Sequence, residues 1–142
     1  MELKRVVVTG LGAITPLGND VDTTWANALN GVSGAGPITH FDASLFKTKF
    51  ACEVKGYNPD DHFDRRKARQ LDLYAQYALV AARQAVADAA IETAPEGTVD
   101  KNRVGVIVAA GIGGLHTFEE EAGYYAMNAD KGPKYNPFFI PK

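Results

Sequence analysis

The stretch VVVTGLGAITPLG, residues Val6 to Gly18, places an apolar run directly before a glycine turn. Three consecutive β-branched residues open the segment Val6–Thr9, a pattern that predicts a buried strand. Gly10 and Gly12 follow at once, and glycines at such positions allow a tight exit from a central strand. Because nucleotide-binding loops also follow a strand and are rich in glycine, the first question is whether this loop holds a nucleotide.

A dinucleotide-binding loop has the pattern G-x-G-x-x-G and opens a helix within the turn. Here Thr15 takes the third glycine's place, Pro16 follows it, and the next helix is predicted only from Val21. No G-K-[ST] follows, so the loop is not a phosphate-binding P-loop either. We interpret the loop as a structural strand exit, and a nucleotide-dependent oxidoreductase is the weaker alternative.

Outward from this loop, strands and helices alternate along the chain. The predicted elements are a helix over Val21–Asn30, short strands around Lys49–Val54, a helix over Arg66–Ala90, a strand over Arg103–Gly111 and a helix over Phe118–Met127. The valine-rich strands lack polar alternation, which is typical of a parallel sheet covered by helices on both faces. This order predicts an α/β fold.

The first helix has clear start and stop signals. Asn19 or Asp20 can cap its N-terminus, and Gly31 follows its C-terminus. Its apolar stripe, which we expect to be buried, consists of Val21, Trp25, Ala28 and Leu29.

Composition limits the function classes. The 142 residues fit one domain, and 46% of them are apolar. The net charge of -2 gives no general attraction to nucleic acid or to an anionic membrane, and no apolar run is long enough for membrane insertion. The single cysteine, Cys52, excludes an internal disulfide and a multi-thiolate metal site. The N-terminus has no secretory cleavage pattern, so a cytoplasmic protein is expected.

The chain closes on an apolar run, NPFFIPK, which contains Phe138, Phe139 and Ile140. Chain ends are usually polar, so we expect these residues to be part of a longer protein. The 142 residues alone are expected to be poorly soluble, because their strands would lack partners.

Several stretches together resemble the β-ketoacyl-acyl carrier protein synthases. The similar stretches are RVVVTGLGAITPLGNDVDTTWANALNGVSG, ITHFDASLFKTKFACEV, RQLDLYAQYALVAARQAVADA, RVGVIVAAGIGGLHTFEEE and NPFFIP, in this order. The similarity is greatest to the elongating type II enzymes of bacterial fatty-acid synthesis. It covers all of residues 1–142, which would form the N-terminal portion of a thiolase-like domain.

The resemblance implies a fold of two similar α/β halves in layers of helix and sheet. It implies acyl transfer to a cysteine, decarboxylation of a malonyl unit and Claisen condensation, in a homodimer that needs no cofactor. Acyl-loaded and malonyl-loaded acyl carrier proteins would be its partners. A thiolate nucleophile and oxyanion-stabilising amides account for such chemistry.

The family's nucleophilic cysteine and histidines lie farther along the chain than residue 142, so no catalytic residue is assigned here. Cys52 lies in KFACEV, outside the nucleophile motif, and we expect a packed thiol. His40, His62 and His116 match no catalytic histidine motif and are expected at the surface or in turns.

The resemblance does imply substrate-binding residues. Ile112 in AAGIGG matches an isoleucine at the bottom of the acyl pocket, near the dimer interface, that gates chain length. Phe138 and Phe139 match an aromatic pair near the same pocket. From the residues alone, Ile112 is better explained as a core isoleucine after a strand, and the two phenylalanines fit a core and a pocket equally well.

A basic cluster in DRRKARQ resembles the family's docking patch for the acidic carrier protein: Arg65, Arg66, Lys67 and Arg69. Cations at a helix start oppose the macrodipole, which favours a binding role over a stabilising one. Without the resemblance, a solvated run of charges would be the better interpretation of these residues. Gln70 stands where relatives can carry another cation. The run Glu119–Glu121 is interpreted as a solvated helix face and not as a metal site.

A second hypothesis is a non-catalytic ketosynthase-like partner that sets chain length in a polyketide system. Such partners replace the nucleophilic cysteine, so residues outside this chain decide between the two.

Overall fold

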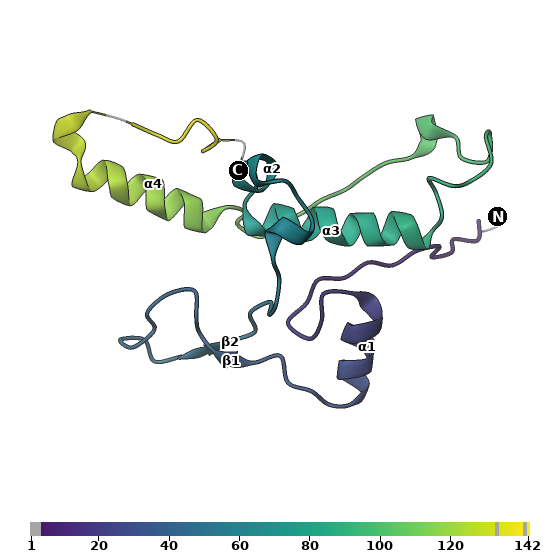
Figure 1. Cartoon of the computed structure of the whole chain (residues 1–142), viewed down its shortest axis with the longest axis horizontal. Coiled ribbons are helices and arrows are strands. Elements are labelled where there is room, and N and C mark those ends of the chain that lie inside the picture. Colours follow the sequence, from purple (N-terminus) through teal and green to yellow (C-terminus); the bar gives the residue numbers. More distant parts are fainter. Residues whose placement is uncertain (1–3, 133, 141) are drawn as a thin grey trace. The chain divides into compact units, whose positions relative to one another are not determined.

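The computed structural model describes residues 4–132, 134–140 and 142 (Figure 1). They form two compact units, which we describe separately. Unit 1 contains Met1–Tyr57 and Val80–Val104, and unit 2 contains Asn58–Leu79 and Gly105–Lys142.

The helices are α1 (Val21–Leu29), α2 (Arg65–Gln70), α3 (Leu73–Asp88) and α4 (Leu115–Met127). Strands β1 (Gly36–Pro37) and β2 (Phe50–Ala51) and the short 3-10 turns η1 (Pro59–Asp61), η2 (Lys101–Arg103) and η3 (Ala129–Lys131) complete the set in the described part of the chain (Figure 1). No helix among the described residues is long and apolar enough to cross a membrane.

Helix α1 in unit 1 forms as predicted. The Asp20 carboxylate accepts a hydrogen bond from the Thr23 amide at 2.7 Å and from the Thr23 hydroxyl at 2.8 Å. These bonds lower the pKa of Asp20 below its ordinary value. Gly31 has a φ of +67°, the left-handed conformation that glycine adopts readily after a helix end.

The predicted burial of the α1 stripe is wrong. Trp25 is 64% exposed and Leu29 is 69% exposed. The polar side of α1 faces the preceding loop instead. The Thr24 hydroxyl donates to the Gly18 carbonyl, and the side-chain amide of Asn27 donates to the Leu17 carbonyl at 2.6 Å. The helix is therefore oriented by hydrogen bonds rather than by its apolar face.

The short strand predicted around Lys49–Val54 is confirmed. Strands β1 and β2 pair antiparallel, with Gly36 opposite Ala51 and Pro37 opposite Phe50. Glu53 closes the pair by accepting hydrogen bonds from the hydroxyl and amide of Thr39. These two bonds lower the pKa of Glu53.

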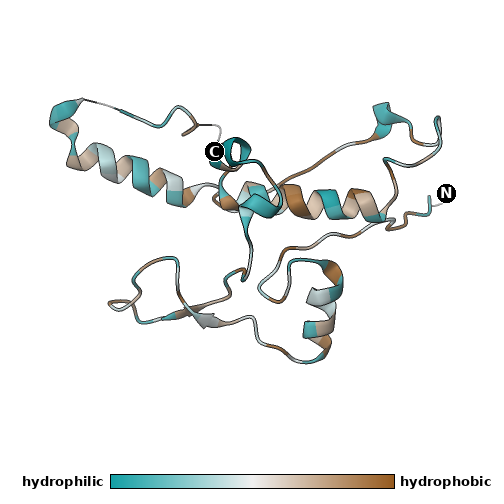
Figure 2. Ribbon diagram, in the orientation of Figure 1, coloured by the Kyte–Doolittle hydropathy of each residue, from teal (hydrophilic) through white to brown (hydrophobic). Residues whose placement is uncertain are grey.

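The predicted strands Val6–Thr9 and Arg103–Gly111 are wrong for the described structure. Both segments run outside any sheet, and η2 covers Lys101–Arg103 (Figure 1). Their apolar side chains are exposed: Val6 is 91% exposed and Ile107 is 97% exposed. Figure 2 colours the ribbon by hydropathy, and hydrophobic colour marks much of both segments. A strand needs a hydrogen-bonded partner, and the described residues supply none to either segment. The parallel sheet expected from them is likewise not formed; the sheet present is the antiparallel pair β1–β2.

The predicted single helix Arg66–Ala90 is also wrong. The chain forms α2 and α3, separated at Leu71, whose φ of -120° and ψ of 133° are extended. The buried side-chain amide of Gln76 donates to the backbone carbonyls of Ala68 and Leu71 at 3.1 and 3.0 Å. A side chain of α3 therefore supplies hydrogen bonds to carbonyls at the end of α2 that have no helical partner. Helix α3 ends at Asp88 rather than at Ala90.

The third predicted helix is confirmed as α4, which begins earlier than expected, at Leu115. In unit 2, the segment after α4 folds back along it through ring contacts described below. Few apolar side chains are buried among the described residues: Ala43 and Val80 in unit 1 and Phe63 in unit 2. Hydrogen bonds, helix caps and ring pairs supply further contacts within each unit.

Candidate functional site

A cavity of about 430 Å³ lies at the start of α4 in unit 2. Its lining consists of Ile112, Gly114, Leu115, Phe118, Phe139, Ile140 and Lys142. The structure thus brings together two of the predicted substrate-binding residues, Ile112 and Phe139. Phe138 does not line this cavity. Ile112 is 76% exposed, so its side chain is available for contact rather than packed in a core.

Stacked rings form one wall beside this cavity. Phe118 on α4 stacks on Phe139, with ring centroids 6.1 Å apart and planes inclined by 26°. Tyr135 stacks on the same Phe139 at 5.7 Å and contacts Tyr125 of α4 at 5.8 Å. Each such pair adds to the stability gained from burial, so the C-terminal segment is held on α4.

Sequence reasoning missed Leu115 and Phe118 as lining residues. Both lie on one face of α4 at a spacing of i and i+3, which was a usable signal once the helix start was known. The predicted start at Phe118 placed Leu115 outside the helix and hid this spacing.

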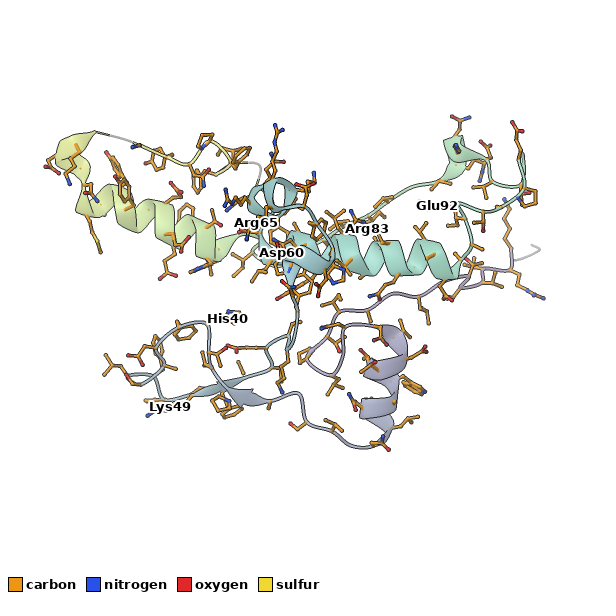
Figure 3. All side chains as sticks on the ribbon, viewed as in Figure 1. His40, Lys49, Asp60, Arg65, Arg83 and Glu92 are labelled. Carbon is orange, nitrogen blue, oxygen red and sulfur yellow. The ribbon has the colours of Figure 1, made fainter. Side chains whose placement is uncertain are left out.

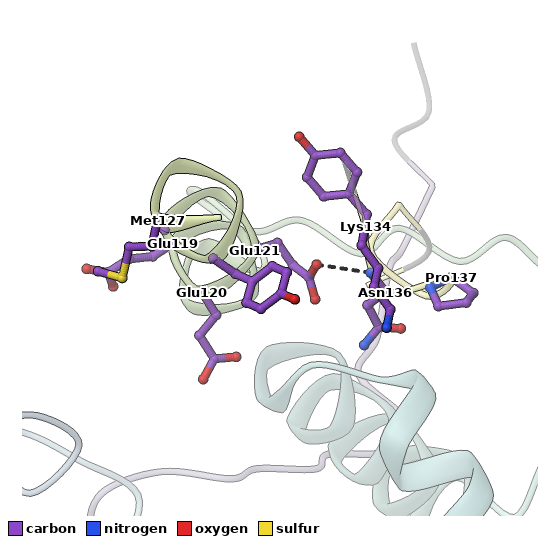
Figure 4. Close-up of a pocket in the computed structure, with 10 residues that line it drawn as sticks. Glu119, Glu120, Glu121, Met127, Lys134, Asn136 and Pro137 are labelled. Carbon is purple, nitrogen blue, oxygen red and sulfur yellow. Dashed lines mark hydrogen bonds between the residues drawn. The ribbon is translucent and has the colours of Figure 1, made fainter. Parts of the chain in front are cut away.

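The acidic run on α4 is not uniformly solvated. Glu119 and Glu120 are exposed, but Glu121 is half-buried and accepts a hydrogen bond from the Asn136 amide at 3.0 Å (Figure 4). The Asn136 side chain in turn accepts from the Phe138 amide at 2.9 Å. The prediction of a solvated face is therefore wrong for Glu121, which anchors the aromatic segment and borders a second cavity of about 850 Å³.

The first turn of α4 is tied to the junction between α2 and α3. Thr117 donates its hydroxyl hydrogen bond to Asp72 Oδ1 at 2.5 Å. Gly114, the N-cap of α4, has no side chain to cap the helix, and Asp72 Oδ2 lies directly against it. A carboxylate at a helix N-terminus is favoured by the helix dipole.

The four basic residues of the predicted docking patch are exposed on α2: Arg65, Arg66, Lys67 and Arg69. Arg65 and Arg69, with Asp60 of η1, border a cavity of about 420 Å³; Figure 3 labels Asp60 and Arg65. The predicted opposition between the cations and the helix dipole is wrong for Lys67 and Arg69. Helix α2 is short, and both residues fall in its last turn, where the dipole favours cations. The case for docking therefore rests on exposure and positive charge.

The backbone amides of the opening loop donate hydrogen bonds to side chains of α3 within unit 1. The Leu11 amide donates to Asp88 Oδ2 and the Ala13 amide donates to Gln84 Oε1, each at 2.9 Å. A Cβ on Gly12 would overlap the Ala81 carbonyl, so this glycine is needed for close approach of the loop to α3. A phosphate would have to displace these side chains and meet the Asp88 carboxylate, which supports the interpretation as a structural loop.

The side chain of Cys52 is exposed, so the predicted packed thiol is wrong. It lies just after β2, which pairs with β1. His40 and His116 are exposed and His62 follows η1, as expected for surface or turn residues. On α4, His116 Nε2 lies 3.3 Å from Glu120 Oε1. No group of three or more metal-ligating side chains is found in the described ranges.

Comparison with known proteins agrees with the resemblance noted in the sequence. The family model described as "Beta-ketoacyl synthase, N-terminal domain" matches residues 3–141. The chain is 48% identical over 139 residues to 3-oxoacyl-[acyl-carrier-protein] synthase 2 of Staphylococcus aureus (strain COL), covering 97% of this chain and 32% of that protein. It is 43% identical over 142 residues to the protein of the same name from Vibrio harveyi, covering 99% of this chain and 33% of that protein.

Among solved structures, "The ishigamide ketosynthase/chain length factor" is similar with a TM-score of 0.71 and 28% sequence identity. The similarity covers 96% of this chain and 33% of that chain. The chain spans about a third of the length of the curated relatives it matches.

Proposed function

Because this chain belongs to the β-ketoacyl synthase family, we propose that the whole protein is an elongating 3-oxoacyl-acyl carrier protein synthase, active in fatty-acid synthesis in the cytoplasm. The observation that carries this proposal is the 48% identity to the Staphylococcus aureus synthase along 97% of the chain. The described residues form the start of its thiolase-like domain, and the layered fold is completed by the rest of that domain.

The reaction joins two acyl units. An acyl group is held as a thioester on an enzyme cysteine. In malonyl-carrier protein the bond to the carboxylate breaks and releases CO2, leaving an enolate. The enolate carbon bonds to the acyl carbonyl carbon, and the cysteine leaves as a thiolate that takes up a proton. The product is a β-ketoacyl-carrier protein, and no oxidant or cofactor is required.

In this proposal the nucleophilic cysteine and the catalytic histidines belong to the rest of the protein, as the family resemblance implies. The proposal gives Cys52 no catalytic role, which is supported by its place directly after β2 rather than at a helix N-terminus, where a reactive thiolate would be stabilised. These 142 residues contribute binding surfaces rather than reacting groups.

One such surface is the end of the acyl site. Ile112 and Phe139 line the cavity at the start of α4, and a flexible apolar chain would gain free energy by entering it. Phe138, which does not line this cavity, is proposed to contact the acyl chain near the same site and near the interface of a homodimer. Ile112, flanked by glycines, limits how long a chain the site accepts.

The other surface is the basic face of α2, which docks the acidic acyl carrier protein. Its exposed guanidinium and ammonium groups attract an acidic partner over a distance and mainly raise the association rate. Such attraction weakens as salt rises.

The similarity to a ketosynthase/chain length factor favours one second candidate, a non-catalytic partner that sets chain length. The identity to that structure is 28%, against 48% for the Staphylococcus aureus synthase, so the condensing enzyme is the better supported function.

The direct test is condensation by the whole protein. Purified protein is mixed with acyl-carrier protein and malonyl-carrier protein, and the products are followed by mass spectrometry. We expect β-ketoacyl-carrier protein and CO2 in equal amounts. Decarboxylation without condensation, or no reaction by a folded protein, would support the chain-length partner instead.

A further inference from the structure

Two polar side chains are buried among the described residues, and both lie in unit 2. Gln76 is 5% exposed and Thr117 is 6% exposed. Buried polar groups are stabilised only when their hydrogen bonds are made, so such groups specify one arrangement of the chain around them. Gln76 bonds to the carbonyls at the end of α2, and Thr117 bonds to Asp72.

Asp72 is the residue that joins these elements. It follows Leu71 at the junction of α2 and α3, and its carbonyl accepts the first helical bond of α3, from the Gln76 amide at 3.0 Å. Its Oδ1 accepts the Thr117 hydroxyl at 2.5 Å. Its Oδ2 is buried and meets no hydrogen-bond donor among the described residues.

The unpaired oxygen lies against the backbone of Gly114. A Cβ on Gly114 would overlap Asp72 Oδ2, and a Cβ on Gly113 would lie 3.6 Å from the ring of Tyr74. Gly113 has a φ of +73°, which glycine tolerates without strain. The loop that carries Ile112 is therefore held at its base by contacts with the start of α3.

We infer that Asp72 is a positioning residue for the acyl site: its hydrogen bond to Thr117 fixes the Ile112–Gly114 loop, and with it the acyl chain length that the site accepts. The inference rests on the proposed function. The Asp72 carboxylate lies beside Gly114 at the positive end of the α4 dipole, and its hydrogen bond from the Thr117 hydroxyl holds the first turn of α4 in place. Leu115 and Phe118, which also line the cavity, lie in this same turn.

The test uses the whole protein and compares acyl-carrier proteins from hexanoyl to palmitoyl. Thr117→Val removes the hydroxyl and keeps the shape, whereas Thr117→Ser keeps the hydroxyl. Asp72→Ala and the double variant complete a mutant cycle. Thr24→Val is the matched control, because it removes a threonine hydroxyl bond within unit 1.

The measured quantity is selectivity, the ratio of kcat/KM for the most preferred to that for the least preferred acyl chain. We expect Thr117→Val and Asp72→Ala each to reduce this selectivity about tenfold. That is the effect of losing one charge-assisted hydrogen bond when the loss lowers kcat/KM for the preferred acyl chain alone. The selectivity of the double variant should be no lower than that of the less selective single variant. Thr117→Ser should retain selectivity, and Thr24→Val should leave it unchanged even where its melting temperature falls.

A proportional loss of kcat/KM for every acyl chain, following the loss of stability, would overturn the positioning role. So would additive effects of the two single variants. Failure of the proposed function has a different signature, since the unmodified protein would then condense no acyl chain at all. Faster hydrogen exchange at the Gly114–Phe118 amides of Thr117→Val, absent in Thr117→Ser, would show that the bond holds this turn.

Discussion

Gly12 allows the opening loop to lie directly on helix α3. Its Cα faces the carbonyl of Ala81 so closely that any side chain would overlap backbone atoms. Sequence alone identified these glycines as a tight turn after an apolar run. It did not identify the helix they approach, because that contact joins residues about 70 positions apart in the chain.

We predict that Gly12→Ala lowers the free energy of unfolding of the whole protein by about 1–3 kcal/mol, because the added methyl forces the loop away from α3. Gly105→Ala is the control, since a Cβ there meets nothing within 4 Å. Urea denaturation of both variants measures the difference. Equal stability of the two variants would contradict the close approach.

Glu53 gives the β1–β2 pair a dependence on pH. Hydrogen bonds from Thr39 lower the pKa of Glu53 in the folded protein, so the ionised form is favoured by folding. The stability from these bonds is present above the unfolded pKa, about 4.3, and is lost as pH falls through the lower folded pKa. We predict that Glu53→Gln flattens the decline in stability below about pH 5.

The comparison is made by measuring melting temperature against pH for the two proteins. Glu96→Gln, which removes the same charge at an exposed position, serves as the control and should follow the unmodified protein. Parallel curves for Glu53→Gln and the unmodified protein would show that the Thr39 bonds do not stabilise the carboxylate.

At the scale of elements, local signals predicted which segments are helical better than they predicted where the helices begin, break and end. The Asp20 cap and Gly31 stop located α1 correctly. The break between α2 and α3 was missed because the alanine-rich pattern continues across Leu71 and Asp72 with no glycine or proline. The break is stabilised by hydrogen bonds from Gln76 to Leu71 and from Thr117 to Asp72. Thr117 lies 45 residues from Asp72, and a local sequence pattern cannot predict so distant a partner.

The valine runs illustrate the opposite error. Val6–Thr9 and Arg103–Gly111 have strand composition, but composition reports only that side chains prefer burial. A strand also needs a neighbouring strand, which the described residues do not provide. For the candidate site, the resemblance to a family predicted Ile112, Phe138 and Phe139, of which Ile112 and Phe139 line one cavity. The hydrogen bond between Thr117 and Asp72 is visible only in the structure.

We predict that Gln76→Met destabilises the α2–α3 junction by about 1–3 kcal/mol, because the carbonyls of Ala68 and Leu71 lose a buried donor. Methionine has a similar volume, so packing is largely kept. Hydrogen exchange at the amides of α2 should become faster. Gln70→Met is the control, since Gln70 makes no side-chain hydrogen bond in the described structure; equal exchange in both variants would exclude this role for Gln76.

At the scale of the whole molecule, the basic face of α2 predicts a salt-dependent partner. Reversing Arg65 and Arg69 to glutamate should raise KM for carrier-protein substrates about tenfold and weaken the dependence of kcat/KM on salt. Steady-state kinetics at low and high salt measure both. Reversal of Lys101 and Arg103, on η2 of the other unit, is the control with the same change in net charge. An equal effect from both pairs would indicate general attraction rather than docking at α2.

The most direct test of the account locates the acyl group on the enzyme. The whole protein is incubated with acyl-carrier protein, without malonyl-carrier protein, and its peptides are mapped by mass spectrometry. The account predicts a thioester on a cysteine outside residues 1–142, with Cys52 unmodified and Cys52→Ser fully active. An acyl group on Cys52, or a folded protein that forms no acyl-enzyme, would contradict the claim that these residues shape the acyl site of a condensing enzyme without supplying its nucleophile.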